Sequence, residues 1–415
     1  MNQRMSLPWF TEKDIELSKA DGIRDPMGRL GVWRTGVGRM LVPNIASPVN
    51  RVYGILAVIF IYRIIEIAAS QGRNWGFVKL FRLLEGTIEY YLSQNESKSI
   101  IYGQQALGDP LLFTIATTDT RTVCNGLRQY YRGTCKRAQL VNNRLTGLTD
   151  EARNKCEEIV SAREIAALPI WNALDKCIKN DKRIHPGETL IEPATKKVFD
   201  RHFDLLYWKE WLKEPVLGTR SEYFEFARLC SEHRLNGNQL KTTTEAMKIE
   251  LVDTIDRDIT IKRVLDTIEK CERFICWVCY THEWLLQCDR KSLEYVANNL
   301  NEVHSELKNA AADFYKIDRS YWTSRFEQYR VLAEAASRST KDFIAANLNL
   351  HEEIMKERGL QPLVMEEKQY ETICVVNPII YDWTPKKIAD RVADGYWLND
   401  YYMSAVGSIY NQLWN

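Results

Sequence analysis

The sequence predicts a mostly α-helical protein made of two or three packed helical bundles, with at most a small β ribbon. Apolar residues recur at the three- and four-residue spacing of amphipathic helices along most of the chain. Segments with the apolar and β-branched character of strands are few. The 415 residues exceed the ~250–300 residues at which one hydrophobic core stops growing, so more than one cooperative unit is expected.

The first strong helical segment is the most apolar one. Residues 52–62 form an uncharged run that ends at Arg63, well short of the ~20 residues that span a bilayer. We therefore predict a buried central helix and no membrane association. Arg63 and Glu66 are three residues apart, the spacing at which side chains pair on a helix.

Three more helices are predicted in the first half. Residues 75–94 carry an amphipathic stripe. Residues 150–177 open with acidic side chains after Thr149, as the helix dipole favours, and Pro169 should kink or split this helix. Residues 194–214 form another helix that we expect to stop at Pro215.

The second half is almost wholly helical in pattern from residue 221 to residue 357. Its expected helices are 243–287, with a break near 256–260, then 292–315, 321–337 and 340–357. The best strand candidates are 111–118 and 372–381, which either pair as a ribbon or stay extended, because Pro378 argues against a central strand.

We expect three domains. They are a basic N-terminal helical domain (1–149), a helical bundle domain (150–358) and a C-terminal extended segment followed by an aromatic helix (359–415).

Composition indicates a soluble cytoplasmic protein. Apolar residues make up 45% of the chain and charged residues 27%, which is ordinary for a globular protein. Ten cysteines are too sparse for a disulfide scaffold. Residues 1–10 contain Arg4 and Pro8 and lack the apolar core of a secretory signal.

Charge is distributed unevenly along the chain. Residues 1–149 hold 19 Lys and Arg against 11 Asp and Glu, or +8, whereas residues 150–415 hold 37 against 44, or −7, which together give the net +1. A basic front half favours a polyanionic or acidic partner. The alternative is that the two halves attract each other.

The strongest basic segment is 120–149, which has six cations, interleaved tyrosines and no acidic residue. Cations neutralise phosphates, and tyrosine rings stack on bases or sugars. DNA or RNA binding is one interpretation, and docking onto acidic protein surface is the other. The proposed contact residues are Arg121, Arg128, Arg132, Lys136, Arg137 and Arg144.

Two further segments are candidates for binding a partner protein. Residues 24–51 combine arginines with glycines that allow close packing, and residues 396–414 are unusually aromatic, as interface hot spots are. In both, packing within the chain is the alternative. The candidate residues are Arg29, Arg34, Arg39, Tyr396, Trp397, Tyr401, Tyr402 and Trp414.

No catalytic, metal or cofactor site is predicted. Cys276 and Cys279 have CxxC spacing but lie in an apolar helical run without the turn that zinc sites need, so we expect buried thiols. Glu366, Glu367 and Lys368 are the acid-plus-lysine set that a hidden metal-dependent nuclease would use, but the expected helix or loop context is wrong for that fold.

Residues 25–66 carry a pattern of a DPLG-like turn, a Trp, a Gly-Arg pair, a Pro-containing turn, an Arg and an apolar helix. In this pattern the segment resembles the N-terminal module of poorly characterised bacterial proteins of antiphage defence islands. The resemblance implies an accessory subunit that works with an ATPase, helicase or nuclease, and it brings no catalytic residues. The matching positions are Asp25, Pro26, Gly28, Trp33, Gly38, Arg39, Pro43, Asn44, Ser47, Arg51 and the helix from Tyr53.

The sequence thus favours a non-enzymatic scaffold or sensor subunit of a prokaryotic antiviral defence complex, which binds nucleic acid or a partner through its basic N-terminal half. The alternatives are a viral-type nucleoprotein or filament-forming RNA-binding structural protein, and an enzyme whose residues converge only in the fold.

Overall fold

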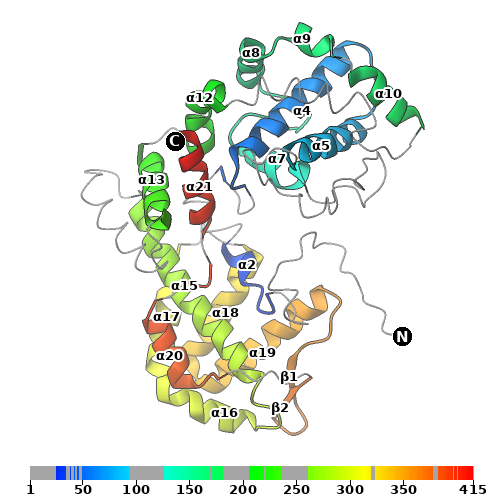
Figure 1. Ribbon diagram of the computed structural model, residues 1–415. Helices are drawn as coiled ribbons and strands as arrows, with labels where there is room; N and C mark the ends of the chain where they lie inside the picture. The colour runs from blue at the N-terminus through cyan, green and yellow to red at the C-terminus, as the bar shows by residue number, and fades with distance from the viewer. Residues whose placement is uncertain are drawn as a thin grey trace. The chain divides into compact units, whose positions relative to one another are not determined.

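A computed structural model shows a mostly helical protein with one two-stranded antiparallel sheet among its described residues (Figure 1). The predicted fold class is confirmed. The structure describes residues 25–33, 38, 42, 44–45, 49–93, 126–168, 170–180, 205–218, 221–235, 260–318, 323–376, 382–395, 397–399 and 401–414.

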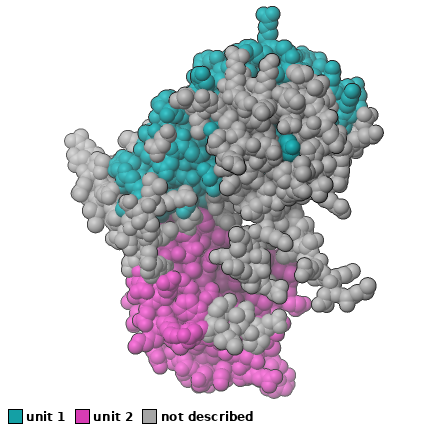
Figure 2. Space-filling model, in the orientation of Figure 1, with its two compact units in different colours: residues 1–19, 42–234, 402–415 teal, residues 20–41, 235–401 magenta. Residues whose placement is uncertain are grey.

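The chain forms two compact units (Figure 2). Unit 1 comprises residues 1–19, 42–234 and 402–415, and unit 2 comprises residues 20–41 and 235–401. This division differs from the three consecutive segments expected from the sequence, because the last helix belongs to the same unit as the N-terminal half.

Unit 1 is organised around α4 (Val52–Ser70), which is buried along most of its length. Among the described helices, α4 alone is long and apolar enough to cross a membrane, but 78% of its apolar window is buried inside the protein, as in the core helix of a soluble protein. The other helices of unit 1 are α5 (Phe77–Ser93), α7 (Leu127–Arg137), α8 (Asp150–Ile159), α9 (Ala162–Ala166), α10 (Ile170–Asn180), α12 (Leu205–Leu217), α13 (Ser221–Leu235) and α21 (Met403–Trp414).

Helix α7 packs closely against α4 at Gly54. A Cβ added at Gly54 would lie 2.1 Å from the ring of Tyr131, so the missing side chain lets α7 approach α4. The first amide of α4, at Val52, donates to Oε1 of Gln412 on α21 (2.9 Å). The C-terminal helix therefore caps the central one.

Unit 2 is built on the long helix α15 (Thr260–Leu285), against which α17, α19 and α20 pack. In its small sheet, β1 (Val364–Glu367) pairs antiparallel with β2 (Thr372–Val375), and Val364 lies opposite Val375. Its other elements are α2 (Arg29–Val32), α16 (Leu293–Leu300), the 3₁₀ helix η4 (Asn301–Val303), α17 (His304–Tyr315), α18 (Ser324–Arg338), α19 (Thr340–Glu357) and α20 (Pro385–Ala393).

Several boundaries differ from the sequence prediction. The expected helix 150–177 is three helices. The division between α9, which ends at Ala166, and α10, which begins at Ile170, confirms the predicted split at Pro169. The division between α8 and α9 was not predicted, and there the side chains of Ser161 and Glu164 form a capping box that starts α9. Helix α12 continues through Pro215, where the proline removes one helical hydrogen bond shortly before the helix ends at Leu217.

The small ribbon also differs from the prediction in its pairing. Residues 372–375 are a strand as predicted, but their partner is 364–367. The other candidate strand, 111–118, lies outside the described residues. Residues 292–315 are two helices divided by η4.

Candidate nucleic-acid interface

Helix α7 presents three cations at four-residue spacing. One face, containing Leu127, Tyr131, Thr134 and Cys135, is buried. Arg128, Arg132 and Lys136 are half-buried and follow each other at i, i+4 and i+8, which places them in one row on a helix. Burial of the apolar face against α4 therefore fixes the direction of the basic row.

A buried carboxyl group lies beside the first two of these cations. Glu85 on α5 is 3% exposed, and its Oε1 accepts the backbone N–H of Arg128 (2.8 Å). Burial raises the pKa of Glu85 to about 7, although the charges of Arg128, Arg82 and Arg132 act to lower it. Near neutral pH this group is therefore only partly ionised.

Tyr62 on α4 interacts with one of these arginines. The ring is fully buried, and its hydroxyl donates to the carbonyl oxygen of Leu145 (3.1 Å) and interacts with the side chain of Arg132. Burial raises the pKa of Tyr62 to about 12, so it remains a neutral hydrogen-bonding group at physiological pH.

Arg82, Arg128 and Arg132, hereafter the arginine cluster, carry an excess of positive charge. Burial, together with the charges of Arg132 and Arg82, lowers the pKa of Arg128, which is the sign of crowded cations. Nε of Arg128 is buried without a hydrogen-bond partner. Within the described part of the chain, no carboxylate lies within 4.0 Å of the three guanidinium groups. Among the described acidic residues, Glu85 is the one that interacts with all three cations, and it offsets their charge only in part.

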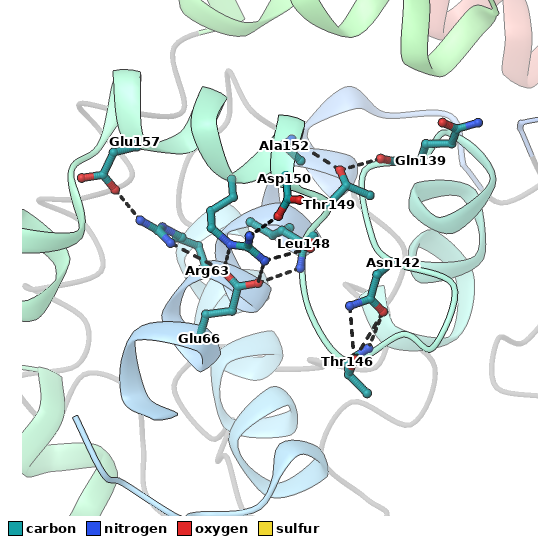
Figure 3. A network of polar contacts seen from close by, with 11 residues as sticks. Arg63, Glu66, Gln139, Asn142, Thr146, Leu148, Thr149, Asp150, Ala152 and Glu157 are labelled. Carbon is teal, nitrogen blue, oxygen red and sulfur yellow. Dashed lines mark hydrogen bonds and ion pairs between the residues drawn. The ribbon is translucent and has the colours of Figure 1, made fainter. Parts of the chain in front are cut away.

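The loop that follows α7 is fastened to α4 by a separate ionic network (Figure 3). Glu66 accepts two hydrogen bonds from the guanidinium of Arg153 (3.1 Å each) and one from the backbone N–H of Leu148 (2.8 Å). Arg63 lies 3.5 Å from Glu66, which confirms the pairing predicted from their spacing, and it also pairs with Glu157.

The same network explains the shape of the loop. Gly147 approaches Glu66 so closely that a Cβ there would lie 2.8 Å from the carboxylate. The loop exposes Arg144 to solvent. Because Glu66 is saturated by these donors, it is not a counterion for the arginine cluster.

The remaining members of the predicted basic set are placed as follows. Arg137, at the end of α7, donates to the hydroxyl of Thr134 (3.3 Å) and is half-buried. Arg121 lies outside the described residues. The structure therefore brings together Arg128, Arg132 and Lys136 on one row, and adds Arg82 and Glu85, which the sequence analysis did not single out.

A signal for Glu85 was present in the sequence. Glu85 lies four residues after Phe81, beside the apolar stripe of 75–94. A carboxyl group at that position is expected to be at least partly buried. Its proximity to Arg128 depends on the packing of α5 against α7, for which the sequence holds no local pattern.

No protein-family model, curated protein or solved structure matches the chain. Guanidinium groups bind phosphate oxygens through paired N–H donors, so the side chains of the arginine cluster have the chemistry that suits an anion such as a phosphodiester.

The segment that carries the sequence resemblance is divided between the two units: residues 25–41 belong to unit 2, and residues 42–66, with the start of α4, belong to unit 1. The carboxylate of Asp25 accepts the backbone N–H groups of Arg29 (2.8 Å) and Leu30 (3.1 Å) and so starts α2. The carbonyl of Met27 accepts the hydroxyl of Tyr329 (3.0 Å). Gly28 has φ +63°, and a Cβ there would lie 2.9 Å from Nε of Arg325.

Arg29 is held in this packed environment. Burial lowers its pKa, but nearby acidic groups, which include Asp25 and Glu272, raise it overall. It therefore stays charged inside unit 2. Arg34 and Arg39 lie outside the described residues, so a partner-binding role for these three arginines stays a prediction.

The aromatic C-terminal residues make extensive contacts within the chain. Tyr401 is fully buried and donates its hydroxyl to Glu272, and its ring lies 5.4 Å from that of Trp397. Tyr402 is 2% exposed. Trp414 stacks on Tyr410 at 4.4 Å. Tyr396 lies outside the described residues, and partner binding by this set also stays a prediction.

The other sequence candidates do not assemble into a site. Cys276 and Cys279 are buried on α15, and burial raises the pKa of both thiols, which confirms the predicted placement. Glu366 and Glu367 are on β1, and Lys368 is in the turn that follows. The described residues contain no group of three or more His, Cys, Asp or Glu placed to hold a metal ion.

Proposed function

We propose that this protein is a nucleic-acid-binding subunit without catalytic activity, and that unit 1 contacts the phosphates of DNA or RNA through the arginine cluster and the neighbouring Lys136 and Arg144. The observation that carries this proposal is the excess charge of Arg82, Arg128 and Arg132 around one partly ionised carboxyl group. Arg121 and Arg137 extend the same basic segment.

The cellular setting rests on the resemblance of residues 25–66. It supports a cytoplasmic accessory role in a prokaryotic antiviral defence assembly, alongside an ATPase, helicase or nuclease subunit. The burial of α4 fits a soluble protein. No cofactor or metal is needed for this role.

The test is binding of short labelled DNA and RNA oligonucleotides at low salt. We expect the double variant Arg128→Gln and Arg132→Gln to bind at least ~10-fold more weakly than the wild-type protein, because hydrogen bonds to charged groups contribute about 1.5–3 kcal/mol each. Fluorescence anisotropy measures the dissociation constants, and circular dichroism checks the fold.

A matched control removes two cations elsewhere on unit 1. Arg163 on α9 and Lys176 on α10 are exposed, and changing both to Gln alters net charge equally. The control variant should bind as the wild-type protein does. Absence of binding by the wild-type protein to either nucleic acid, or equal weakening in both double variants, would contradict the proposal.

A further inference from the structure

The geometry of Glu85 suggests how the nucleic-acid site is regulated. Its carboxyl group is inside the protein, 3% exposed, and it accepts a hydrogen bond from the backbone N–H of Arg128 (2.8 Å). A carboxyl group this buried is costly to ionise unless cations stabilise it. The arginine cluster supplies them.

The charged groups that act on Glu85 lie on α5 and α7. Arg82 is one turn earlier on α5 itself, and α7 contributes Arg128 and Arg132. From α4, the hydroxyl of Tyr62 interacts with Arg132 and stays neutral. These are the charged and titratable groups that set the state of Glu85 among the described residues.

On α10, which also packs against α5, Asp175 accepts Nε1 of Trp75 (3.1 Å) and pairs with Lys179 (2.6 Å). On α4, Arg63 and Glu66 belong to the network of Figure 3. A phosphate bound at the arginine cluster would reduce the positive charge that favours ionisation of Glu85.

We propose that Glu85 partly balances the charge of the arginine cluster through space, and that a phosphodiester of DNA or RNA bound to the cluster takes over this role, with uptake of a proton from solvent by the ionised fraction of the Glu85 carboxyl group. This inference rests on the proposed function. A bound phosphate weakens the attraction between Glu85 and the arginines, so the carboxyl group takes up a proton more readily. Binding is therefore tighter at lower pH.

The experiment compares the wild-type protein with Glu85→Gln, which keeps an oxygen to accept the N–H of Arg128. The wild-type affinity for an oligonucleotide without terminal phosphate should rise about fivefold between about pH 8 and about pH 6, which is the change expected when a bound phosphate raises the pKa of Glu85 from about 7 by one unit. The Glu85→Gln protein should bind as tightly as the wild-type protein does at low pH, with little pH dependence. Histidines elsewhere act equally in both proteins.

Isothermal titration calorimetry in two buffers of different ionisation enthalpy measures how many protons are taken up on binding. It needs only the wild-type protein, so the test remains possible if the variant does not fold. Proton uptake on binding at neutral pH supports the inference. Equal pH dependence in wild-type and Glu85→Gln proteins, or binding without proton uptake, overturns it while leaving the proposed function intact. No binding at any pH would instead mean that the proposed function itself is wrong.

Discussion

Gly54 sets the distance between α4 and α7, and thus the position of the arginine cluster. A methyl group at this position would overlap the ring of Tyr131, since the nearest ring atom would lie 2.1 Å away. Both residues are buried, so neither has room to move. A single absent side chain therefore positions Arg128 and Arg132.

We predict that Gly54→Ala destabilises unit 1 by ~3 kcal/mol or more, because overpacking a closed core costs at least ~1–3 kcal/mol. Gly133→Ala is the control on α7: its Cβ would meet only the end of the Arg137 side chain, at 3.4 Å. That change should be neutral or stabilising by about 0.5–1 kcal/mol, because alanine favours helix. Urea unfolding measures both. Equal effects would contradict the proposed packing.

The sequence allowed prediction of the basic residues on α7 but not of their counterion. Arg128, Arg132 and Lys136 stand out because no acid is near them in the chain. Glu85 belongs to another helix, and its effect on them arises only when α5 packs against α7. Local patterns predict which residues carry charge, whereas contacts between elements decide how that charge behaves.

At the level of elements, helices α15 and α19 of unit 2 meet at a pair of buried histidines. The rings of His282 and His351 lie 4.3 Å apart. Nδ1 of His351 donates to the carbonyl of Pro26 (3.0 Å), and its Nε2 accepts the N–H of Leu363 (2.9 Å). The ring of His282 is fully buried and interacts with the polar side chain of Asn347.

This pair should make unit 2 sensitive to acid. Burial lowers the pKa of both histidines, and that of His282 falls well below its usual value. In the unfolded chain these histidines take up protons with a pKa of ~6.5, whereas in the folded protein they stay neutral to lower pH. Their contribution to the free energy of unfolding is therefore complete above pH ~6.5 and is lost as the pH falls below it. Each histidine contributes up to about 1.4 kcal/mol per pH unit.

Hydrogen exchange of the α19 amides should show this loss of protection as the pH falls below ~6.5, after correction for intrinsic exchange. The variant His282→Leu removes one of the two titrating groups and should depend less on pH. The measurement must report on unit 2 alone. The raised pKa of Glu85 makes unit 1 less stable as the pH rises, whereas the lowered pKa of the histidines makes unit 2 less stable as the pH falls. A variant as acid-sensitive as the wild-type protein would argue against this role of His282.

The elements themselves were largely predictable where caps and periodicity agree. Residues 340–357 form α19 with the predicted bounds, and Ser339 caps its first turn. The break between α8 and α9 was missed, although Ser161 and Glu164 have capping-box spacing. The division of 292–315 by η4 has no comparable signal in the sequence.

At the level of the whole molecule, the two units are not consecutive in the chain. The C-terminal helix α21 belongs to unit 1, where Gln412 caps α4, and the segment with the sequence resemblance is divided between unit 2 (residues 25–41) and unit 1 (residues 42–66). The length of the chain predicted more than one unit. It held no information about which distant segments would pack together, because that depends on long-range side-chain contacts such as the one between Val52 and Gln412.

The central claim is that the arginine cluster of unit 1 neutralises nucleic-acid phosphates. The salt dependence of oligonucleotide binding tests it most directly, because each neutralised phosphate adds ~0.7–0.9 to the slope of log K against log salt. Changing Arg128 and Arg132 to Gln should lower that slope by about 1.5, whereas changing Arg163 and Lys176 should leave it unchanged. A slope identical in the wild-type protein and the Arg128 and Arg132 variant would contradict the claim.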